Sequence, residues 1–191
     1  MESTFGVGLV AYNMSFSEIS ILTNCLRSEN PGYMVVVDNS PHTISKSIFE
    51  SKGWIYISNT SNPGFGKSHN DIFNLYGKLC KYHLVINPDI FFSKGVIKNL
   101  INFMNSKQDA GAVMPKILFN DGKDQGLVKL LPSPVNLLIN KLSLEFLNRF
   151  NSKFLFESIN LDKGVHKIPF LSGCFLFLRS SVISKIGLFD E

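Results

Sequence analysis

The sequence is poor in cysteine, in tryptophan and in charged residues. Its 191 residues include three cysteines and one tryptophan, and 18% of them are charged. Cys25, Cys80 and Cys174 are far apart and odd in number, and no CxxC pair occurs. This spacing argues against a zinc site. We expect reduced thiols in a cytoplasmic protein.

Long hydrophobic runs and dense basic blocks are also missing. No apolar run reaches the roughly 18 residues that a membrane-spanning helix needs. The first four residues lack the basic region and cleavage site of a signal peptide, so we expect none. The net charge of +4 is too small, without Lys/Arg blocks interleaved with aromatics, to predict nucleic-acid binding. What the sequence does have is 45% hydrophobic residues, including 17 phenylalanines, enough for one domain with a sizeable core.

Strand-like and helix-like patterns alternate along the first 115 residues. The predicted strands are 7–12, 33–37, 54–58, 84–86 and 112–114. The predicted helices are 17–27 with Ser17 as N-cap, 43–52, one through 72–79, and one from Ser93 as N-cap to 104. This alternation predicts an α/β fold with a mostly parallel central sheet flanked by helices.

The second part of the chain follows a different pattern. It has a loop, an amphipathic segment over 135–150 and a predicted strand over 174–178. We therefore expect one domain with two halves, residues 1–115 and residues 116–191. The amphipathic segment is basic, and it either lies on an anionic membrane surface or packs on the protein's own core.

Polar residues follow the second predicted strand. In an open α/β sheet, ligands bind outside the carboxyl ends of the strands. Asp38 stands at such an end, with Asn39 and Ser40 behind it. Its carboxylate can accept hydrogen bonds from a ribose or a base N–H group. Alternatively, it caps the helix that follows.

A glycine-rich stretch follows the third predicted strand. It reads Asn62-Pro63-Gly64-Phe65-Gly66. Glycines let a backbone approach a ligand closely, and a helix that starts just after them presents N–H groups to a phosphate. A plain turn is the alternative. A P-loop is not indicated, because the residue before Asn62 is a serine where that motif needs glycine.

The string Asn87-Pro88-Asp89 follows the fourth predicted strand. An aspartate on such a loop can bind Mg²⁺ or Mn²⁺ through oxygen, and these ions share their coordination with substrate phosphates. The metal would then assist departure of a diphosphate as a Lewis acid. A turn aspartate after proline is the alternative.

Six motifs in this order make the chain resemble a known family. They lie at residues 36–40, 62–70, 87–89, 114–122, 171–179 and 186–191. The chain resembles the family 2 inverting glycosyltransferases of the GT-A fold, in the rhamnosyltransferase-like subgroup of bacterial O-antigen, lipopolysaccharide and capsule synthesis. The resemblance covers nearly the whole chain. It implies that residues 1–115 form the nucleotide-sugar-binding half and residues 116–191 the acceptor-side half.

The resemblance implies transfer of rhamnose or a similar sugar from a nucleotide-diphospho-sugar to a lipid-linked saccharide, with inversion and with Mg²⁺ or Mn²⁺. The setting would be the inner face of the cytoplasmic membrane, with peripheral contact through residues 135–150. The implied nucleotide-binding residues are Asp38, Asn39, Asn62, Gly64, Phe65, Gly66 and Asn70. The implied metal ligands are Asp89 and Asn87, and the floor where donor and acceptor meet is Ser172, Gly173 and Cys174.

The general base is the exception to this match. Family members carry it beyond the Phe-Asp-Glu string with which this chain ends, so Asp190 and Glu191 are only weak candidates. Inverting transfer needs a carboxylate that takes the acceptor's proton. We therefore expect a truncated chain with weak or absent transfer activity.

Two other functions stay open. The first is a truncated, non-catalytic fragment that binds a nucleotide sugar or a partner. The second is a sugar nucleotidyltransferase, which shares the sheet type. That class needs a basic, glycine-rich loop after the first strand, and residues 11–14 do not supply one.

Overall fold

The computed structural model describes residues 4–41, 46–127 and 164–191. The chain divides into two compact units. The first consists of Met1–Val113 with Gly173–Glu191, and the second of Met114–Ser172. The amphipathic segment predicted over 135–150 lies outside the described residues.

The first unit is built on a six-stranded sheet with the order β3-β2-β1-β4-β6-β5. The strands are β1 (Phe5–Ala11), β2 (Tyr33–Asp38), β3 (Ile55–Ser58), β4 (Tyr82–Ile86), β5 (Ala112–Val113) and β6 (Phe175–Arg179). β1 is parallel to β2 and β4, and β2 is parallel to β3. β6 is antiparallel to both its neighbours, β4 and β5. The predicted α/β fold with a mostly parallel sheet is confirmed, and β6 is its one reversed strand among the described residues.

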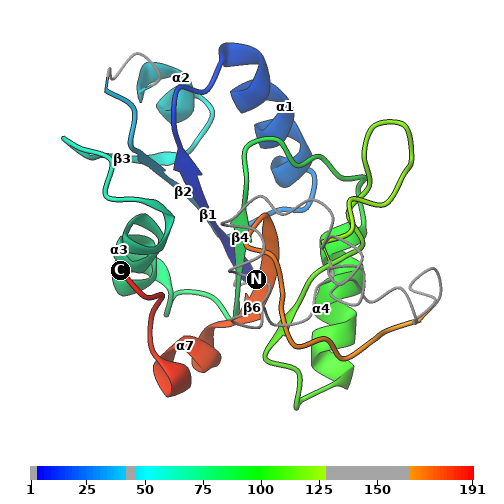
Figure 1. Ribbon diagram of the computed structural model, residues 1–191. Helices are drawn as coiled ribbons and strands as arrows, with labels where there is room; N and C mark the ends of the chain where they lie inside the picture. The colour runs from blue at the N-terminus through cyan, green and yellow to red at the C-terminus, as the bar shows by residue number, and fades with distance from the viewer. Residues whose placement is uncertain (1–3, 42–45, 128–163) are drawn as a thin grey trace, which may run out of the picture. The chain divides into compact units, whose positions relative to one another are not determined.

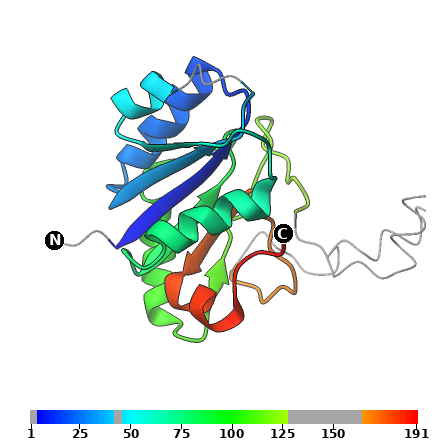
Figure 2. The same ribbon diagram turned by 90° about the vertical axis from the view of Figure 1, so that its left-hand side faces the viewer.

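Helices cover both faces of this sheet. They are α1 (Phe16–Arg27), α2 (Lys46–Ser51), α3 (Phe65–Tyr76), α4 (Val96–Ser106) and α7 (Ser180–Ile186). Figure 1 and Figure 2 show α3 and α7 on one face, and α1 and α4 on the other. On the α3 face, Phe73 packs with Val85 of β4 and Leu178 of β6, and Ile183 of α7 joins this cluster. One part of the core of the first unit therefore lies beneath α3, and the buried side chains of α1 and α4 belong to the opposite face.

The helix starts differ from those predicted. Ser15, not Ser17, is the N-cap of α1, because a capping box needs a glutamate three residues later and Glu18 supplies it. The Glu18 amide donates to Ser15 Oγ over 3.3 Å, and the Ser15 amide donates to the Glu18 carboxylate over 2.8 Å. α4 starts after Gly95, not at Ser93, because Gly95 takes the left-handed conformation (φ 97°) in which the chain turns into the helix.

The described part of the second unit contains a tight turn. Leu118 and Asp124 form an isolated antiparallel bridge, and the Lys123 amide donates to the Asp121 carboxylate over 3.0 Å. Lys116 and Asp124 form an exposed ion pair at 3.3 Å. None of the described helices has the length and apolar character that crossing a membrane requires.

Candidate functional site

The carboxyl ends of the parallel strands place two of the predicted motifs at one edge of the sheet. Asp38 at the end of β2 pairs in register with Ala11 of β1, and Leu9 of β1 pairs with Ile86 at the end of β4. Residues 87–89 leave the sheet at the same edge as Asp38, with β1 between them. Neighbouring strands lie about 4.8 Å apart, so β2 and β4 are separated by about 10 Å.

Asp38 is buried and its carboxylate is fully engaged. It is 2% exposed. One oxygen accepts from the Ser40 amide over 2.9 Å and from Ser40 Oγ, and the other accepts from the Tyr56 hydroxyl over 2.7 Å. Burial, and then this bond to Asp38, raise the pKa of Tyr56 to about 12. Asp38 therefore ties the end of β2 to β3, and a ribose or base would share a carboxylate that already accepts three hydrogen bonds.

Asn39 fixes the glycine-rich stretch to the end of β2. Its amide nitrogen donates to Ser68 Oγ over 2.9 Å and to Asn62 Oδ1 over 3.2 Å. Its oxygen accepts from Asn59 Nδ2 over 2.8 Å. Residues on both sides of the turn before α3 are thus held by one buried amide. The sequence singled out Asn39 as a ligand contact, and the structure adds this positioning role.

The first turn of α3 is open to a ligand by its geometry. Asn62 Oδ1 accepts from the Gly64 amide over 3.0 Å, and Gly64, with φ 92°, is the N-cap of α3. No side chain caps the helix start. Uncapped N–H groups at a helix start favour anions, because they carry the positive end of the helix dipole. Residues 64–66 therefore have the geometry expected for a phosphate-binding turn.

Two glycines bring other segments close to this helix start. A Cβ atom on Gly66 would lie 2.7 Å from the backbone oxygen of Asp190, and one on Gly173 would lie 3.1 Å from the Phe65 ring. A side chain at position 66 would displace residues 189–190. The structure thus gathers Phe65, Gly66, Gly173 and Asp190, which the sequence assigned to three separate parts of the site.

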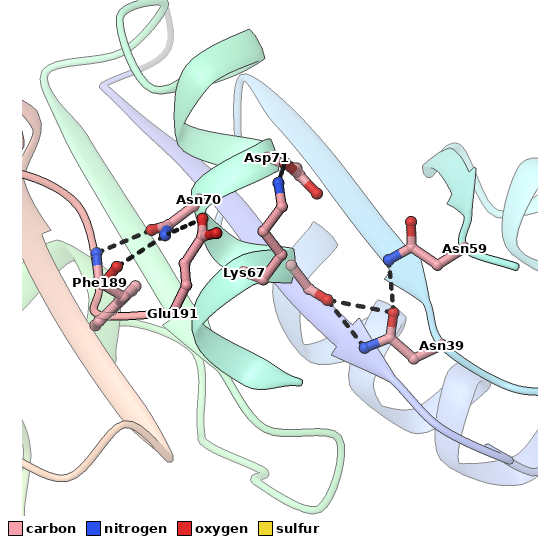
Figure 3. Close-up of polar contacts among 8 residues, drawn as sticks. Asn39, Asn59, Lys67, Asn70, Asp71, Phe189 and Glu191 are labelled. Atoms are coloured by element: carbon pink, nitrogen blue, oxygen red, sulfur yellow. Dashed lines mark hydrogen bonds and ion pairs between the residues drawn. The ribbon is translucent and has the colours of Figure 1, made fainter. Parts of the chain in front are cut away.

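Asn70 fastens residues 189–191 to α3 (Figure 3). Its side-chain oxygen accepts from the Phe189 amide over 2.9 Å. Its Nδ2 donates to the Phe189 carbonyl over 2.9 Å and to the Glu191 carboxylate over 3.0 Å. Lys67 pairs with Asp71 in the neighbouring turn, and the charges of Asp71 and Glu191 add to that hydrogen bond in raising the pKa of Lys67. These contacts between Asn70 and residues 189–191, which we call the clasp, place the weak base candidate Glu191 beside the predicted nucleotide turn.

The Phe189 ring completes this clasp. It lies 5.8 Å from Phe65, 6.1 Å from His69 and 5.8 Å from Phe73, measured between ring centroids. His69 is fully buried, and its ring nitrogens have no hydrogen-bond partner in the part of the chain that the structure describes. Burial lowers the pKa of His69 to about 3, so this imidazole is neutral. No sequence pattern marks Phe189 as a site residue, although it lies in the last of the six motifs.

Asn87 and Asp89 differ from these residues because their side chains are unengaged. Asp89 is exposed and Asn87 is half-buried, and neither side chain has a partner among residues 4–41, 46–127 and 164–191. The Asn87 amide donates to the Cys174 carbonyl over 2.8 Å, which sets residues 87–89 beside Cys174 at the start of β6. Ser172 belongs to the second compact unit.

These two side chains offer oxygen donors that suit a hard cation. Mg²⁺ and Mn²⁺ are bound through one or two carboxylates, waters and substrate phosphates rather than by a closed protein cage. The described residues contain no group of three or more His, Cys, Asp or Glu side chains that could hold a metal alone. One carboxylate and one amide therefore fit an ion that a diphosphate helps to bind.

Solved structures with low sequence identity share this fold. The mannosyltransferase PcManGT from Pyrobaculum calidifontis, in complex with GDP-Man and Mn²⁺, matches with a TM-score of 0.62 and 12% identity, over 100% of this chain and 48% of that chain. S. aureus TarS 1–349 matches with a TM-score of 0.59 and 17% identity, over 95% and 48%. The chain has the GT-A fold of nucleotide-sugar transferases, as the motifs predicted.

A curated relative confirms the resemblance to rhamnosyltransferases. The N-acetylglucosaminyl-diphospho-decaprenol L-rhamnosyltransferase of Mycobacterium tuberculosis is 23% identical over 177 residues, which cover 87% of this chain and 58% of the relative. The chain thus spans a little over half the length of this protein. No protein-family model matches the sequence.

Proposed function

We propose that this chain is the nucleotide-sugar-binding part of a glycosyltransferase that moves rhamnose or a similar sugar onto a lipid-linked saccharide. The observation that carries the proposal is the shared edge of a GT-A sheet, from which Asp38, the turn at 64–66 and residues 87–89 all emerge. A nucleotide-diphospho-sugar carries a base, a diphosphate and a sugar. These three motifs offer a contact for the base or ribose, a phosphate turn and a cation site.

The donor would bind along this edge. Asp38 and Asn39 would contact the base or ribose, and Asn62, Gly64, Phe65, Gly66 and Asn70 would line the nucleotide pocket. The uncapped start of α3 supports a phosphate position there. Ser172, Gly173 and Cys174 would form the floor under the sugar. The tight space beside Gly173, where an added Cβ atom would lie 3.1 Å from the Phe65 ring, supports this role for Gly173.

Asp89 and Asn87 would hold Mg²⁺ or Mn²⁺ together with the donor's diphosphate. The metal would neutralise the diphosphate as it leaves. The unengaged oxygens of both side chains support this assignment, and so does the Mn²⁺ in the Pyrobaculum mannosyltransferase complex. An attack by the acceptor hydroxyl from the opposite side of the sugar would invert the anomeric centre.

The curated relative supports the proposed acceptor. Its name gives a diphospho-decaprenol saccharide as the substrate, which supports a lipid-linked acceptor here. We extend the proposal to bacterial surface polysaccharide synthesis, including O-antigen, at the inner face of the cytoplasmic membrane. Residues 135–150 would make peripheral contact with that membrane.

Titration calorimetry of the full chain with a panel of nucleotide-diphospho-sugars, with and without Mn²⁺, tests the proposal. We expect binding of at least one sugar nucleotide that Mn²⁺ strengthens, and an Asp89→Asn variant that loses the Mn²⁺ effect. Asp109→Asn, a matched change of an exposed aspartate in the turn after α4, should keep it. Metal-independent binding that is equal in both variants would remove the metal assignment. Absence of binding to every sugar nucleotide would refute the function.

A non-catalytic nucleotide-sugar-binding role is the second candidate, and the position of Glu191 favours it. One oxygen of its carboxylate accepts a hydrogen bond from Asn70 over 3.0 Å, which holds the base candidate against α3. A radiolabelled sugar-transfer assay separates the two functions. Donor binding without turnover would support the binding role, and turnover would exclude it.

A further inference from the structure

A polar hollow lies at the opposite edge of the sheet from the proposed donor site. It has a volume of about 520 Å³. Lys78 and Lys81, just before β4, border it on one side. Arg179, the last residue of β6, and the serines of α7 border it on the other. We call it the amino-edge hollow, because the parallel strand β4 starts beside it.

The lining of the amino-edge hollow is cationic. It includes two lysines, one arginine and the hydroxyls of Ser180, Ser181 and Ser184, and no carboxylate is among the described residues that line it. Lys78 has no ion pair or hydrogen bond among the residues that the structure describes, and Lys81 uses one of its donors on Asn105 Oδ1 at 2.7 Å. Several ammonium donors therefore remain available to an anion.

The walls of the hollow are held in place by the fold. The Ser180 amide donates to the Lys81 carbonyl over 3.0 Å, and Ser180 Oγ donates to the Cys80 carbonyl over 2.7 Å. Arg179 Nη2 donates to the Met104 carbonyl at the end of α4 over 2.8 Å. These bonds join the segment after α3, the start of α7 and the end of α4, so the backbone around the hollow and the Arg179 guanidinium are positioned before a ligand arrives.

Ser181 and Ser184 add uncharged donors on one face of α7. They are three residues apart, which puts their side chains on the same side of a helix. Neither hydroxyl has a partner among the described residues. Ammonium groups and hydroxyls around one anion are the donors that bind phosphate oxygens, and charge-assisted bonds are the stronger ones.

We propose that the amino-edge hollow binds a phosphate group, carried either by an anionic membrane lipid or by a free phosphate compound. The hollow lies across the sheet from Asp38 and residues 87–89, so this site does not depend on the proposed transferase function. Leu79 and Ile186, which neighbour lining residues in the sequence, are 66% and 80% exposed, and they would meet lipid if a membrane is the source.

NMR titration of the full ¹⁵N-labelled chain with inorganic phosphate at low salt tests the site. We expect amide shifts at residues 78–81 and 180–184, and a dissociation constant at least about tenfold weaker in Lys78→Gln/Lys81→Gln. Lys52→Gln/Lys98→Gln, which removes the same charge elsewhere, should bind as the parent does. Equal binding by both double variants, or shifts confined to the start of α3, would overturn the proposal.

A second variant and a vesicle experiment complete the test. Ser181→Ala/Ser184→Ala leaves every lysine in place and should weaken phosphate binding by roughly two- to tenfold, so the test survives if the lysine variant does not fold. Cosedimentation with phosphatidylglycerol vesicles, compared with phosphatidylcholine, identifies the source. Lysine-dependent binding to phosphatidylglycerol indicates a lipid headgroup, and phosphate binding without vesicle binding indicates a free compound. Binding to neither probe would overturn the site.

Discussion

Asn70 links two segments that are more than a hundred residues apart. It is 1% exposed, and its side chain makes three hydrogen bonds with residues 189 and 191. A buried amide that satisfies a backbone N–H and a backbone C=O at once is hard to replace, because its loss leaves both groups without partners.

We predict that Asn70→Ala destabilises the protein by about 2–3 kcal/mol, since buried backbone groups lose their bonds. Urea denaturation measures the change, and carboxypeptidase digestion should remove residues 189–191 faster. Asn74→Ala, on the exposed side of the same helix, is the matched control and should behave as the parent does. Unchanged carboxypeptidase protection in Asn70→Ala would show that the clasp does not hold this segment.

Two buried histidines make the stability depend on pH. Burial lowers the pKa of His69 to about 3, and burial, with a smaller contribution from the charge of His69, does the same for His83. An unfolded histidine titrates near 6.5, so between pH 6.5 and 3 the unfolded chain binds more protons than the folded one. Their contribution to stability is therefore present above pH 6.5 and is lost as the pH falls.

We predict that the free energy of unfolding falls by up to about 1.4 kcal/mol per pH unit for each histidine below pH 6.5. His69→Phe replaces one neutral ring among Phe65, Phe73 and Phe189 with another that cannot be protonated. Its stability should decline less steeply with falling pH in urea melts from pH 7 to 4. Parallel curves for the variant and the parent would contradict this account of His69.

At the scale of the element, the start of α1 offers a direct comparison of two serines. Ser15 takes part in the capping box with Glu18, while Ser17 Oγ contacts Ser15 Oγ at 3.0 Å. We predict that Ser15→Ala costs about 1 kcal/mol and Ser17→Ala costs little, because only Ser15 satisfies a free N–H group of the helix start. Thermal unfolding of the two variants measures this, and a reversed order would place the cap where the sequence pattern first put it.

The same helix shows what a local pattern can and cannot predict. The spacing of Ile19, Leu22 and Leu26 was enough to predict a helix, because burial on one face follows from periodicity. The predicted N-cap, Ser17, lies two residues after the observed N-cap, Ser15, because periodicity does not mark where the backbone turns into the helix. The Ser15-x-x-Glu18 pair was the available indication, because a capping box can be read from sequence.

The candidate site also has a part that the sequence predicts and a part that it does not. The edge shared by Asp38, residues 64–66 and residues 87–89 could be predicted, because polar residues after buried parallel strands gather at their carboxyl ends. The hydrogen-bond partners of the site residues could not be predicted. The bonds between Asn70 and Phe189 join positions 119 residues apart, and no periodic pattern encodes such a contact.

At the scale of the whole molecule, the sheet depends on a strand from the far end of the chain. β6 lies between β4 and β5, with Val85 opposite Leu176 and Ala112 opposite Leu178. Without β6, β5 has no neighbour in the sheet. Residues 1–113 therefore contain five of the six strands but not the connection between β4 and β5.

We predict that residues 1–113 alone do not unfold cooperatively, whereas the full chain does. Removing β6 exposes the core side chains that pack against Phe175 and Phe177. Circular dichroism melts of the two chains measure this difference. A sharp transition of the short chain at the temperature of the full chain would show that β6 is dispensable for the sheet.

The reversed strand also has a consequence for biosynthesis. Translation produces the pairing edge of β4 well before Phe175–Arg179, which follow Ile86 by about 90 residues. At roughly 5–20 residues per second, that edge waits about 4–18 seconds for its neighbour. An uncovered strand invites pairing with other nascent chains. The yield of folded protein in the cell should therefore depend on chaperones that bind nascent chains at the ribosome and on the speed at which codons 114–174 are translated.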